Sequence, residues 1–492
     1  MSRVKRLHPV AIFLLFLSAL RELFIPLIAA FIFGRGAASW DFPFTIYFII
    51  GGFLFLFFYG YLKWLTFTYV IEEDELKIKQ GILIKQQRFI RTERIYSIDI
   101  TAGILQRLFQ LVAVKIETAG GGIEPEVLLK ALTKKEALLI KKQLLKEKVQ
   151  VENEMIDSAE DDVGHIIQLE QSQTKWVLSN KDLVITALTS SGIGLAFMAI
   201  LALVTQLEGW VPDEWIVETF GYLFHSSFIF IIVLILTMIL LSWLISIVGT
   251  VLKYGRFTII KKGDELEITR GILERRQLTL SLNRITAIRV VESVLRQPFG
   301  LVTVYVESAG GGSKDEQLST VLFPIVNKKS IYEPLKQIAP DFVFDQPIEP
   351  LPRRAWIRYV IRKVVPAALI AGLITYFMPY GYVAMILIPM AILYGNLQFK
   401  NGGIGRNKGY LWISFRTVSR TLVIIPKQRI QALEVRQSFV QQIRSLFTIQ
   451  VSILSSIIGK SFRLVDVSEK QKEDLLSWFS YKENEKELNH EE

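Results

Sequence analysis

The sequence has 492 residues, of which 51% are hydrophobic and 12% aromatic, and its mean hydropathy is +0.36. A soluble protein of this length rarely has so apolar a composition, so these values indicate a membrane protein with several domains. The net charge of +10 fits Lys and Arg gathered at the cytosolic side, beside anionic lipid, better than nucleic-acid binding. The absence of cysteine excludes disulfides, thiolate metal sites and cysteine nucleophiles.

Six stretches are long and apolar enough to cross a bilayer, for which about 20 residues are needed. They cover residues 11–33, 44–62, 182–205, 223–248, 362–378 and 381–397. The last two are separated only by a tight turn, so they predict a helical hairpin. The segment between the two members of each pair is poor in Lys and Arg, whereas the opposite flanks are basic. This asymmetry predicts a multi-pass cell-membrane protein with both termini in the cytoplasm.

The first span carries two adjacent charged residues, Arg21 and Glu22. A charge at the centre of a membrane helix costs about 2.5–3.5 kcal/mol on insertion scales. Neighbours in sequence do not face each other on a helix, so each residue needs its own partner inside the membrane. Two interpretations remain open at this stage: a structural polar contact between helices, or part of a substrate path.

A similar segment follows each pair of spans. Residues 67–122 align without a gap with residues 257–312, and both segments contain Asp-Glu-Leu, Gly-Ile-Leu, Arg-Ile and Ala-Gly-Gly-Gly in the same order. A third copy keeps Arg429-Ile430, which matches Arg94-Ile95 and Arg284-Ile285, but it lacks the glycine triplet. Fixed-period similarity of this kind indicates one structural unit used three times.

Each copy reads mainly as β structure. Val112, Val114 and Ile116 alternate at period two, and Gly81 indicates a turn after a short strand. The copy closes with an amphipathic helix that begins at a capping-box pattern, Thr133 to Glu136 in the first copy and Ser468 to Gln471 in the third. The predicted fold class is therefore membrane α-helical hairpins plus three α+β barrels, each with about seven antiparallel strands capped by a C-terminal helix.

These patterns predict eight consecutive segments. They are helix pair 1 (1–62), barrel domain 1 (63–146), an acidic linker (147–174), helix pair 2 (175–250), barrel domain 2 (251–345), helix pair 3 (346–398), barrel domain 3 (399–482) and a charged tail (483–492). The acidic linker reads as a solvated connection, and binding of a partner is the alternative.

The order Gly-Ile-Leu, then Arg-Ile-x-x-Ile, then Ala-Gly-Gly resembles the bacterial pleckstrin-homology (bPH) domain family. Together with the spans, the resemblance extends over nearly the whole chain. It implies PH-like barrels and a bacterial plasma-membrane location. It also implies a smaller companion membrane protein with a single bPH domain, and a role in envelope defence or antimicrobial resistance.

Two sets of residues are candidates for interaction or lipid contact. The equivalent arginines Arg94, Arg284 and Arg429 either pair with a carboxylate or carbonyl at a strand start, or contact an anionic headgroup or a neighbouring domain. The glycine triplets serve as turns, or as a backbone platform that another chain or ligand approaches closely; they are Gly120, Gly121, Gly122, Gly310, Gly311 and Gly312.

No catalytic constellation can be assembled from the sequence. The four histidines show no metal-ligand spacing, and Gly459-Lys460-Ser461 lacks the earlier glycine of a phosphate-binding loop. We therefore expect no enzyme activity, cofactor, metal or nucleic-acid partner. The first hypothesis is a non-enzymatic membrane scaffold that binds the anionic inner leaflet and a companion subunit or a second copy. The alternative is a transporter or lipid-handling protein with a path through the helices.

Overall fold

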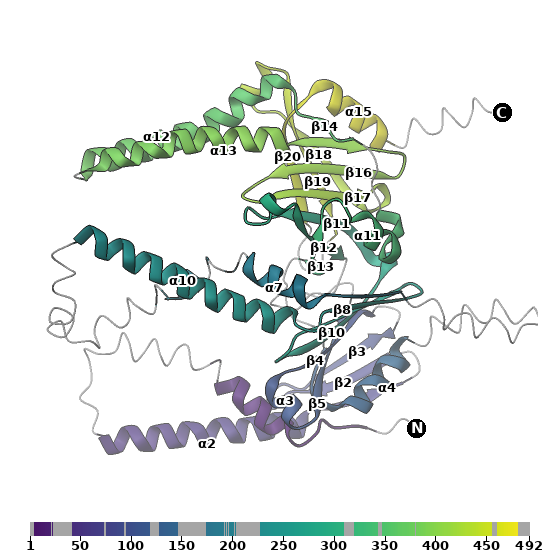
Figure 1. Cartoon of the computed structure of the whole chain (residues 1–492). Helices are drawn as coiled ribbons and strands as arrows, with labels where there is room; N and C mark the ends of the chain where they lie inside the picture. The colour runs from purple at the N-terminus through teal and green to yellow at the C-terminus, as the bar shows by residue number, and fades with distance from the viewer. Residues whose placement is uncertain are drawn as a thin grey trace, which may run out of the picture. The chain divides into compact units, whose positions relative to one another are not determined.

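The structure is a computed structural model that describes most of the chain. The described residues are 4–20, 22, 42–72, 75–92, 95–118, 127–145, 174–190, 192, 194, 196–200, 202, 227–308, 319–342, 347–378, 380–454 and 460–480. The chain divides into two compact units (Figure 1). Unit 1 comprises Met1–Gln173 with Ile260–Ser281, and unit 2 comprises Thr174–Ile259 with Leu282–Glu492.

Unit 1 begins with a helix over Ala11–Leu20, followed by the long helix α2 (Phe42–Thr66). The two helices pack closely at Gly60, where an added Cβ would lie only 3.2 Å from the carbonyl oxygen of Ile12. The indole of Trp64 donates a hydrogen bond of 2.9 Å to the carbonyl of Leu7. A small residue at the crossing and an indole at the helix end therefore fix this pair.

The β structure of unit 1 starts with a three-stranded antiparallel sheet, β1 (Thr68–Ile71), β2 (Glu75–Gln80) and β3 (Gln86–Arg91). Gly81, at φ +111°, makes the turn after β2, which confirms the predicted turn. The chain continues through β4 (Ile95–Ala102), α3 (Ile104–Leu108), β5 (Leu111–Thr118), β6 (Val127–Thr133) and α4 (Lys134–Leu145). The capping box at α4 is confirmed: the Thr133 amide donates to the Glu136 carboxylate at 3.0 Å.

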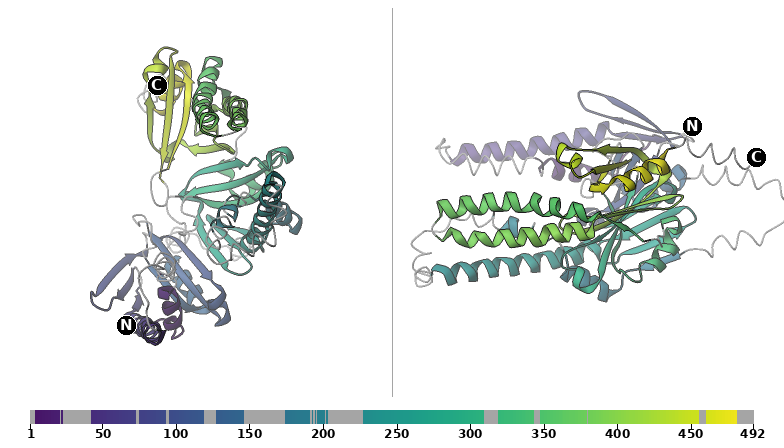
Figure 2. Two further views of the ribbon diagram at one scale, coloured as in Figure 1. Left: turned by 90° about the vertical axis from the view of Figure 1, so that its left-hand side faces the viewer. Right: turned by 90° about the horizontal axis from the view of Figure 1, so that it is seen from above.

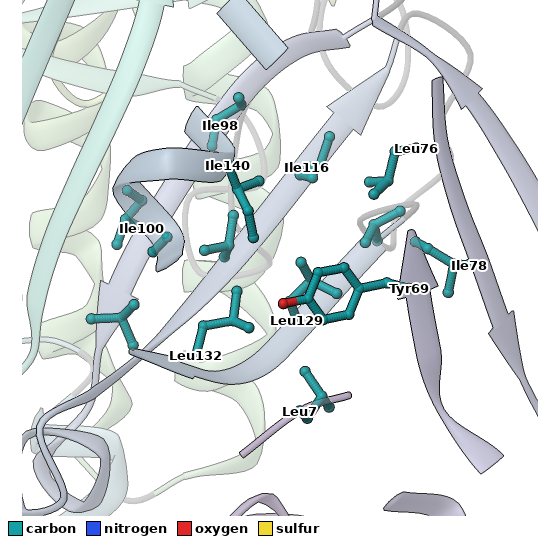
Figure 3. Close-up of a cluster of buried hydrophobic side chains, with 14 of the residues drawn as sticks. Leu7, Tyr69, Leu76, Ile78, Ile98, Ile100, Ile116, Leu129, Leu132 and Ile140 are labelled. Atoms are coloured by element: carbon teal, nitrogen blue, oxygen red, sulfur yellow. The ribbon is translucent and has the colours of Figure 1, made fainter. Parts of the chain in front are cut away.

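The core of unit 1 lies between β1–β3 and β4–β6 (Figure 3). Tyr69 and Leu76 come from the first group of strands, Ile116 and Leu129 from the second, and Ile140 from α4; each is at most 2% exposed. Burial, with the Glu136 charge as a second cause, raises the pKa of the Tyr69 phenol to about 12. The strands β1–β6 and the helix α4 thus enclose side chains that the period-two pattern places inside.

The sheet of unit 1 continues with strands from the second copy of the sequence. β10 (Arg275–Ser281) pairs with β4, and β9 (Glu265–Arg270) pairs with β10. β8 (Thr258–Lys262) lies next, so the order is β6-β5-β4-β10-β9-β8. The second copy therefore supplies strands to a sheet that the first copy begins.

Among the described residues, three helices are long and apolar enough to cross a membrane, and all lie in unit 2: Ile232–Tyr254, Arg353–Phe377 and Gly381–Asn401. They correspond to α10 (Ser227–Tyr254), to α12 (Trp356–Phe377) with the turn before it, and to η7 (Gly381–Ile386) with α13 (Leu387–Asn401). The three helices leave the β structure of this unit on one side (Figures 1 and 2). This arrangement agrees with strand-rich domains on a single face of the membrane.

The third predicted span, 182–205, is wrong as one continuous helix. β7 (Thr174–Val177) precedes α7 (Asn180–Leu188), which ends at Thr189, and helical structure returns at residues 196–200. The hydroxyl of Thr189 donates a hydrogen bond to the carbonyl of Ile185, and a Ser-Ser-Gly sequence follows. Such residues compete with helical hydrogen bonding and favour a break.

The third predicted helix pair corresponds to α12 and α13, which lie side by side (Figure 2). Gly395 permits the close approach, because a Cβ there would lie 2.8 Å from the carbonyl oxygen of Tyr359. The Trp356 indole also donates to Asn396 at 3.3 Å.

The β structure of unit 2 repeats the pattern of unit 1. The second copy contributes η2 (Leu282–Arg284), β11 (Ile285–Glu292), η3 (Gln297–Phe299), β12 (Leu301–Ser308), β13 (Thr320–Asn327) and α11 (Tyr332–Ile338). The third contributes β15 (Gly403–Arg406), β16 (Tyr410–Arg416), β17 (Arg420–Pro426), η8 (Lys427–Arg429), β18 (Ile430–Arg436), α14 (Phe439–Gln442), β19 (Leu446–Ile453), β20 (Lys460–Ser468) and α15 (Glu469–Phe479). The predicted capping box at Ser468 and Gln471 is confirmed.

Two sheets result in unit 2, one in the order β13-β12-β11-β17-β16-β15-β14, where β14 is Glu349–Pro350, and one in the order β18-β19-β20. The core of the third copy lies between β15–β17 and β18–β20, with α15 against it. We call the three copies repeat 1 (β1–β6, α4), repeat 2 (β8–β13, α11) and repeat 3 (β15–β20, α15). The described residues of each repeat form six strands, where about seven were predicted, and strands of successive repeats share one sheet.

Candidate functional site

The site residues predicted from the sequence are spread over the chain. Arg284 ends η2 and Arg429 ends η8, where Arg429 donates to the main-chain carbonyl of Asn283. Glu22 lies in helix and is exposed. Arg21, Arg94 and the glycine triplets lie outside the described residues, as do residues 147–173 of the acidic linker and the charged tail. Arg429 thus joins repeat 3 to the main chain of repeat 2, beside Arg284.

A recurring polar contact links each repeat to the first helix of its pair. The contact is made at a β-bulge between the last two strands, where the register shifts at Val112/Val114, Val302/Val304 and Phe447/Ile449. On the last strand, the partners of Val114, Val304 and Ile449 are Leu129, Phe323 and Leu464. The next residues along that strand are Lys130 in repeat 1, Pro324 in repeat 2 and Val465 in repeat 3. We call these three contacts the helix connectors.

The connector of repeat 1 consists of one side-chain and one main-chain hydrogen bond, the latter from the amide of His8, just before the helix, to the carbonyl of Ala131 at 3.1 Å. The Lys130 ammonium donates to the hydroxyl of Ser18, on the helix over Ala11–Leu20, at 3.1 Å. Burial lowers the pKa of Lys130, and the nearby charge of Lys63 acts in the same direction. Beside it, Gln106 donates to the carbonyl of Lys130 at 2.7 Å and accepts from the amide of Gly103.

The connector of repeat 2 replaces that glutamine with an arginine. Arg296 donates to the carbonyl of Pro324 at 2.7 Å and, through Nε, to the hydroxyl of Thr189 at 3.1 Å. Its other contacts are the hydroxyl of Thr303 and the carbonyl of Thr186. All of these acceptors are neutral, and within the described part of the chain no carboxylate pairs with Arg296. Burial lowers the pKa of Arg296, which is only 6% exposed.

The connector of repeat 3 is an ion cluster. Asp466 is fully buried and accepts from Arg358 Nε at 3.0 Å and from Arg362 Nη2 at 3.1 Å, both on α12. Gln441, which is equivalent to Gln106 and Arg296, donates to the same carboxylate at 2.8 Å. The Tyr359 hydroxyl adds a bond of 2.9 Å to the carbonyl of Val465. The side chains Arg358, Tyr359 and Arg362 share one helix face.

A polar cavity of about 320 Å³ opens beside the connector of repeat 2. Its wall is rich in hydroxyl groups, among them those of Thr186, Thr189, Ser190, Thr250, Ser293 and Thr303, and both Arg289 and Arg296 reach it. The wall includes residues of α7 and α10, of repeat 2 and of the β16–β17 turn of repeat 3. Hydroxyl donors around a buried guanidinium are suited to an anion such as a phosphate group.

A second ion cluster connects β11 and β12 of repeat 2 to β20 of repeat 3. Glu307 is fully buried and contacts Arg289 at 3.2 Å and Lys460 at 2.8 Å, so it binds repeat 2 to repeat 3. Burial lowers the pKa of Lys460, while Glu307 acts against this shift. Because one carboxylate serves two cations, the cluster keeps a positive excess near the cavity. In the described part of the chain, no group of three His, Cys, Asp or Glu side chains could hold a metal ion.

Sequence reasoning missed Arg296, Glu307 and Asp466. Asp466 and Arg358 are 108 residues apart, so no spacing links them. One signal was available: aligned through the repeats, Arg296 stands where repeats 1 and 3 have Gln106 and Gln441. A charge at a position otherwise occupied by an amide marks a residue with an additional role.

The model of the Bacterial PH domain family matches three regions, residues 13–148, 198–340 and 361–483. The chain is also 36% identical over 497 aligned residues to the UPF0699 transmembrane protein YdbT of Bacillus subtilis (strain 168). The match covers 98% of this chain and 99% of that protein. Each matched region combines a helix pair, or part of one, with the strands of one repeat. The chain therefore belongs to the bacterial PH-domain family of transmembrane proteins.

Proposed function

We propose that this protein is a non-enzymatic scaffold of the cell membrane that joins bPH units side by side and acts in envelope defence or antimicrobial resistance with a smaller companion bPH membrane protein. The main support for this proposal is that one sheet continues from repeat 1 into β10 of repeat 2, and another continues from repeat 2 into β17 of repeat 3. Such pairing is a general means by which one strand-rich domain binds another. The companion and the defence role are supported by the family resemblance.

The helix connectors support a scaffold that is coupled to the membrane. A polar or ionic contact joins the strands of each repeat to a helix, so the position of each domain depends on its helix pair. The described helices of unit 2 leave the β structure on one side (Figure 2). Both features favour domains held beside the inner leaflet, with both termini in the cytoplasm.

The test is a deletion strain challenged with a panel of membrane-active antimicrobials and complemented with the tagged full-length chain. We expect greater sensitivity to at least one agent, its reversal by the wild-type chain, and recovery of a smaller bPH membrane protein with the tag. Complementation by Gly372→Ala is the matched control, because a Cβ at Gly372 meets nothing within 4 Å. Unchanged sensitivity across the panel together with a chain that purifies alone would contradict the proposal.

A lipid-handling function is the second candidate, and the cavity beside Arg296 favours it. A buried guanidinium whose partners among the described residues are all neutral, and a hydroxyl wall beside α7 and α10, suit an anionic headgroup. Protein purified with native lipid should then carry more anionic phospholipid than Arg296→Gln does. Equal lipid content in the two preparations would reject this candidate and leave the scaffold proposal unaffected.

A further inference from the structure

Successive repeats are joined by one type of strand contact. In the first junction β4 of repeat 1 pairs antiparallel with β10 of repeat 2, and Ile98 faces Thr279. In the second, β11 of repeat 2 pairs with β17 of repeat 3, and Ile288 faces Ile424. Each junction therefore joins the fourth strand of one repeat to the third strand of the next.

Both junctions have the same register. With Arg94, Arg284 and Arg429 aligned, Ile98 is equivalent to Ile288, and Thr279 is equivalent to Ile424. Equivalent residues therefore face each other in the two junctions. A register shift of one residue would turn every side chain to the other face of the sheet, so the agreement defines a specific mode of binding.

A second contact accompanies the strand pairing. At the first junction Arg107 of α3 donates to the carbonyls of Ile272 and Leu273, in the turn before β10. At the second junction Arg416, at the corresponding turn before β17, donates to Gln297, which is equivalent to Arg107, at 2.7 Å. The junction therefore has two parts, the strand edges and a contact between a short helix and a turn.

Repeats 1 and 3 each have one strand edge that is equivalent to a junction edge but takes no part in either internal junction. Among the described strands, β3 pairs only with β2, and β18 pairs only with β19. Phe89 of β3 is 61% exposed, whereas the equivalent Thr279 and Ile424 are 6% and 1% exposed. Leu83, in the turn before β3, is 95% exposed against 44% for the equivalent Leu273. On the other edge, β18 is partly or fully exposed along its length, whereas most of β11 is buried.

We propose that β3 of one chain pairs with β18 of a second copy of this chain, in the register of the two internal junctions. That register places Phe89 opposite Leu433 and Arg88 opposite Glu434. Phe89 would then lie beside Leu433, which packs on the core of repeat 3. The basic and acidic residues would face each other, as Arg420 and Glu292 do in the second junction.

The pairing is heterologous, because two different edges of the chain meet. Repetition of such a contact produces a closed ring or an open row of chains. The short helix and turn also correspond, since Gln442 of α14 is equivalent to Arg107 and would reach the turn that contains Leu83. The pairing does not depend on a role in envelope defence.

Cysteine cross-linking tests the register directly, because the natural chain has no cysteine. Gln87→Cys and Val435→Cys are introduced separately into two full-length chains that carry different tags and are expressed together. The equivalent internal pair, Gln277→Cys with Ile100→Cys in one chain, is the positive control, since these residues face each other. Mild oxidation of native membranes should join the two differently tagged chains.

Three further variants make the result specific. Glu434→Cys replaces Val435→Cys as the negative control, because successive side chains point to opposite faces of a strand, and its product should be several-fold weaker. Arg88→Glu should lower the Gln87–Val435 product several-fold, and Glu434→Arg in the partner chain should restore it.

Three outcomes would overturn the proposal while the internal control forms its disulfide. The first is no product between the two tagged chains. The second is a product of Gln87→Cys with itself, which would show that two β3 strands pair. The third is a cross-link from either cysteine to a smaller membrane protein, which would show that this protein, and not a second copy of the chain, pairs with β3 or β18. A product between tagged chains supports the proposal even if deletion causes no antimicrobial sensitivity.

Discussion

Asp466→Asn removes the charge at the centre of the third helix connector without changing its shape. Asp466 has φ +64°, and asparagine is tolerated in this left-handed region about as well as aspartate. The carboxylate is fully buried between Arg358, Arg362 and Gln441. The substitution therefore leaves a buried guanidinium without its counter-charge.

The expected loss follows from the geometry of the two ion pairs. Removal of one partner of a buried pair typically costs about 3–5 kcal/mol. The side chain of Arg358 is 14% exposed, so its pair counts in full, whereas that of Arg362 is 41% exposed and is partly screened. The asparagine oxygen still accepts one hydrogen bond. We therefore expect a loss of about 3 kcal/mol, which is roughly a 150-fold rise in the open population of repeat 3.

Thiol labelling in native membranes measures this opening. Val451→Cys places a thiol of similar volume in the core of repeat 3, where the native residue is 0% exposed. Its labelling rate by a maleimide reports how often the core opens. Val114→Cys, at a 0% exposed site in repeat 1, is the matched control. Asp466→Asn should speed labelling at position 451 by about two orders of magnitude and leave position 114 unchanged.

Two results would refute this reasoning. A less than threefold change at Val451→Cys would mean that the cluster contributes almost nothing to the stability of repeat 3. An equal rise at Val114→Cys would mean that the substitution disturbs insertion or folding of the whole chain. Asp466→Asn combined with Arg358→Met should recover part of the loss, because replacing both partners of a buried pair is much less costly than removing one.

Substitutions at three further positions have defined outcomes. Gly395→Ala should lower the melting temperature in detergent by several degrees, because its Cβ would lie 2.8 Å from a carbonyl of α12; Gly372→Ala, with open space around its Cβ, should not. Arg296→Gln should keep the fold, as glutamine occupies this position in the other repeats, whereas Arg296→Ala should destabilise by about 1–3 kcal/mol, measured by chemical unfolding. Glu307→Gln should cost about 3 kcal/mol by the same measurement, since the buried ammonium of Lys460 loses its carboxylate; an unchanged transition would contradict the pairing.

Features encoded by a few neighbouring residues could be predicted from the sequence. The turn at Gly81 requires a positive φ that glycine adopts without strain, and its Cβ would lie 1.9 Å from the carbonyl oxygen of Ile84. The capping boxes at Thr133 and Ser468 depend on residues three positions apart. The break after Leu188 was missed because hydropathy measures apolar length and not the backbone preference of a Ser-Ser-Gly sequence.

The sharing of strands between repeats could not be predicted. Alternation at Ile98 and Ile100 identifies the face of β4 that points to the core, but it does not identify the strand that pairs with the edge of β4. The same alternation would be expected if each repeat closed into a separate barrel or if it paired with the next repeat. The candidate site was hidden for a related reason, since Asp466 and Arg358 meet only after the helix and the last strand have folded.

The repeats are alike in how they contact one another and differ in how they contact their helices. The strand junctions are alike in register, so the repeats bind their neighbours in one way. The helix connectors are not alike: a hydrogen bond from Lys130 in repeat 1, a guanidinium with neutral partners at Arg296 in repeat 2, and a carboxylate between two arginines at Asp466 in repeat 3. Removal of one partner should cost most at Asp466, because it leaves a buried charge without its counter-charge. The connector of repeat 2 differs from the other two because it lies beside the polar cavity.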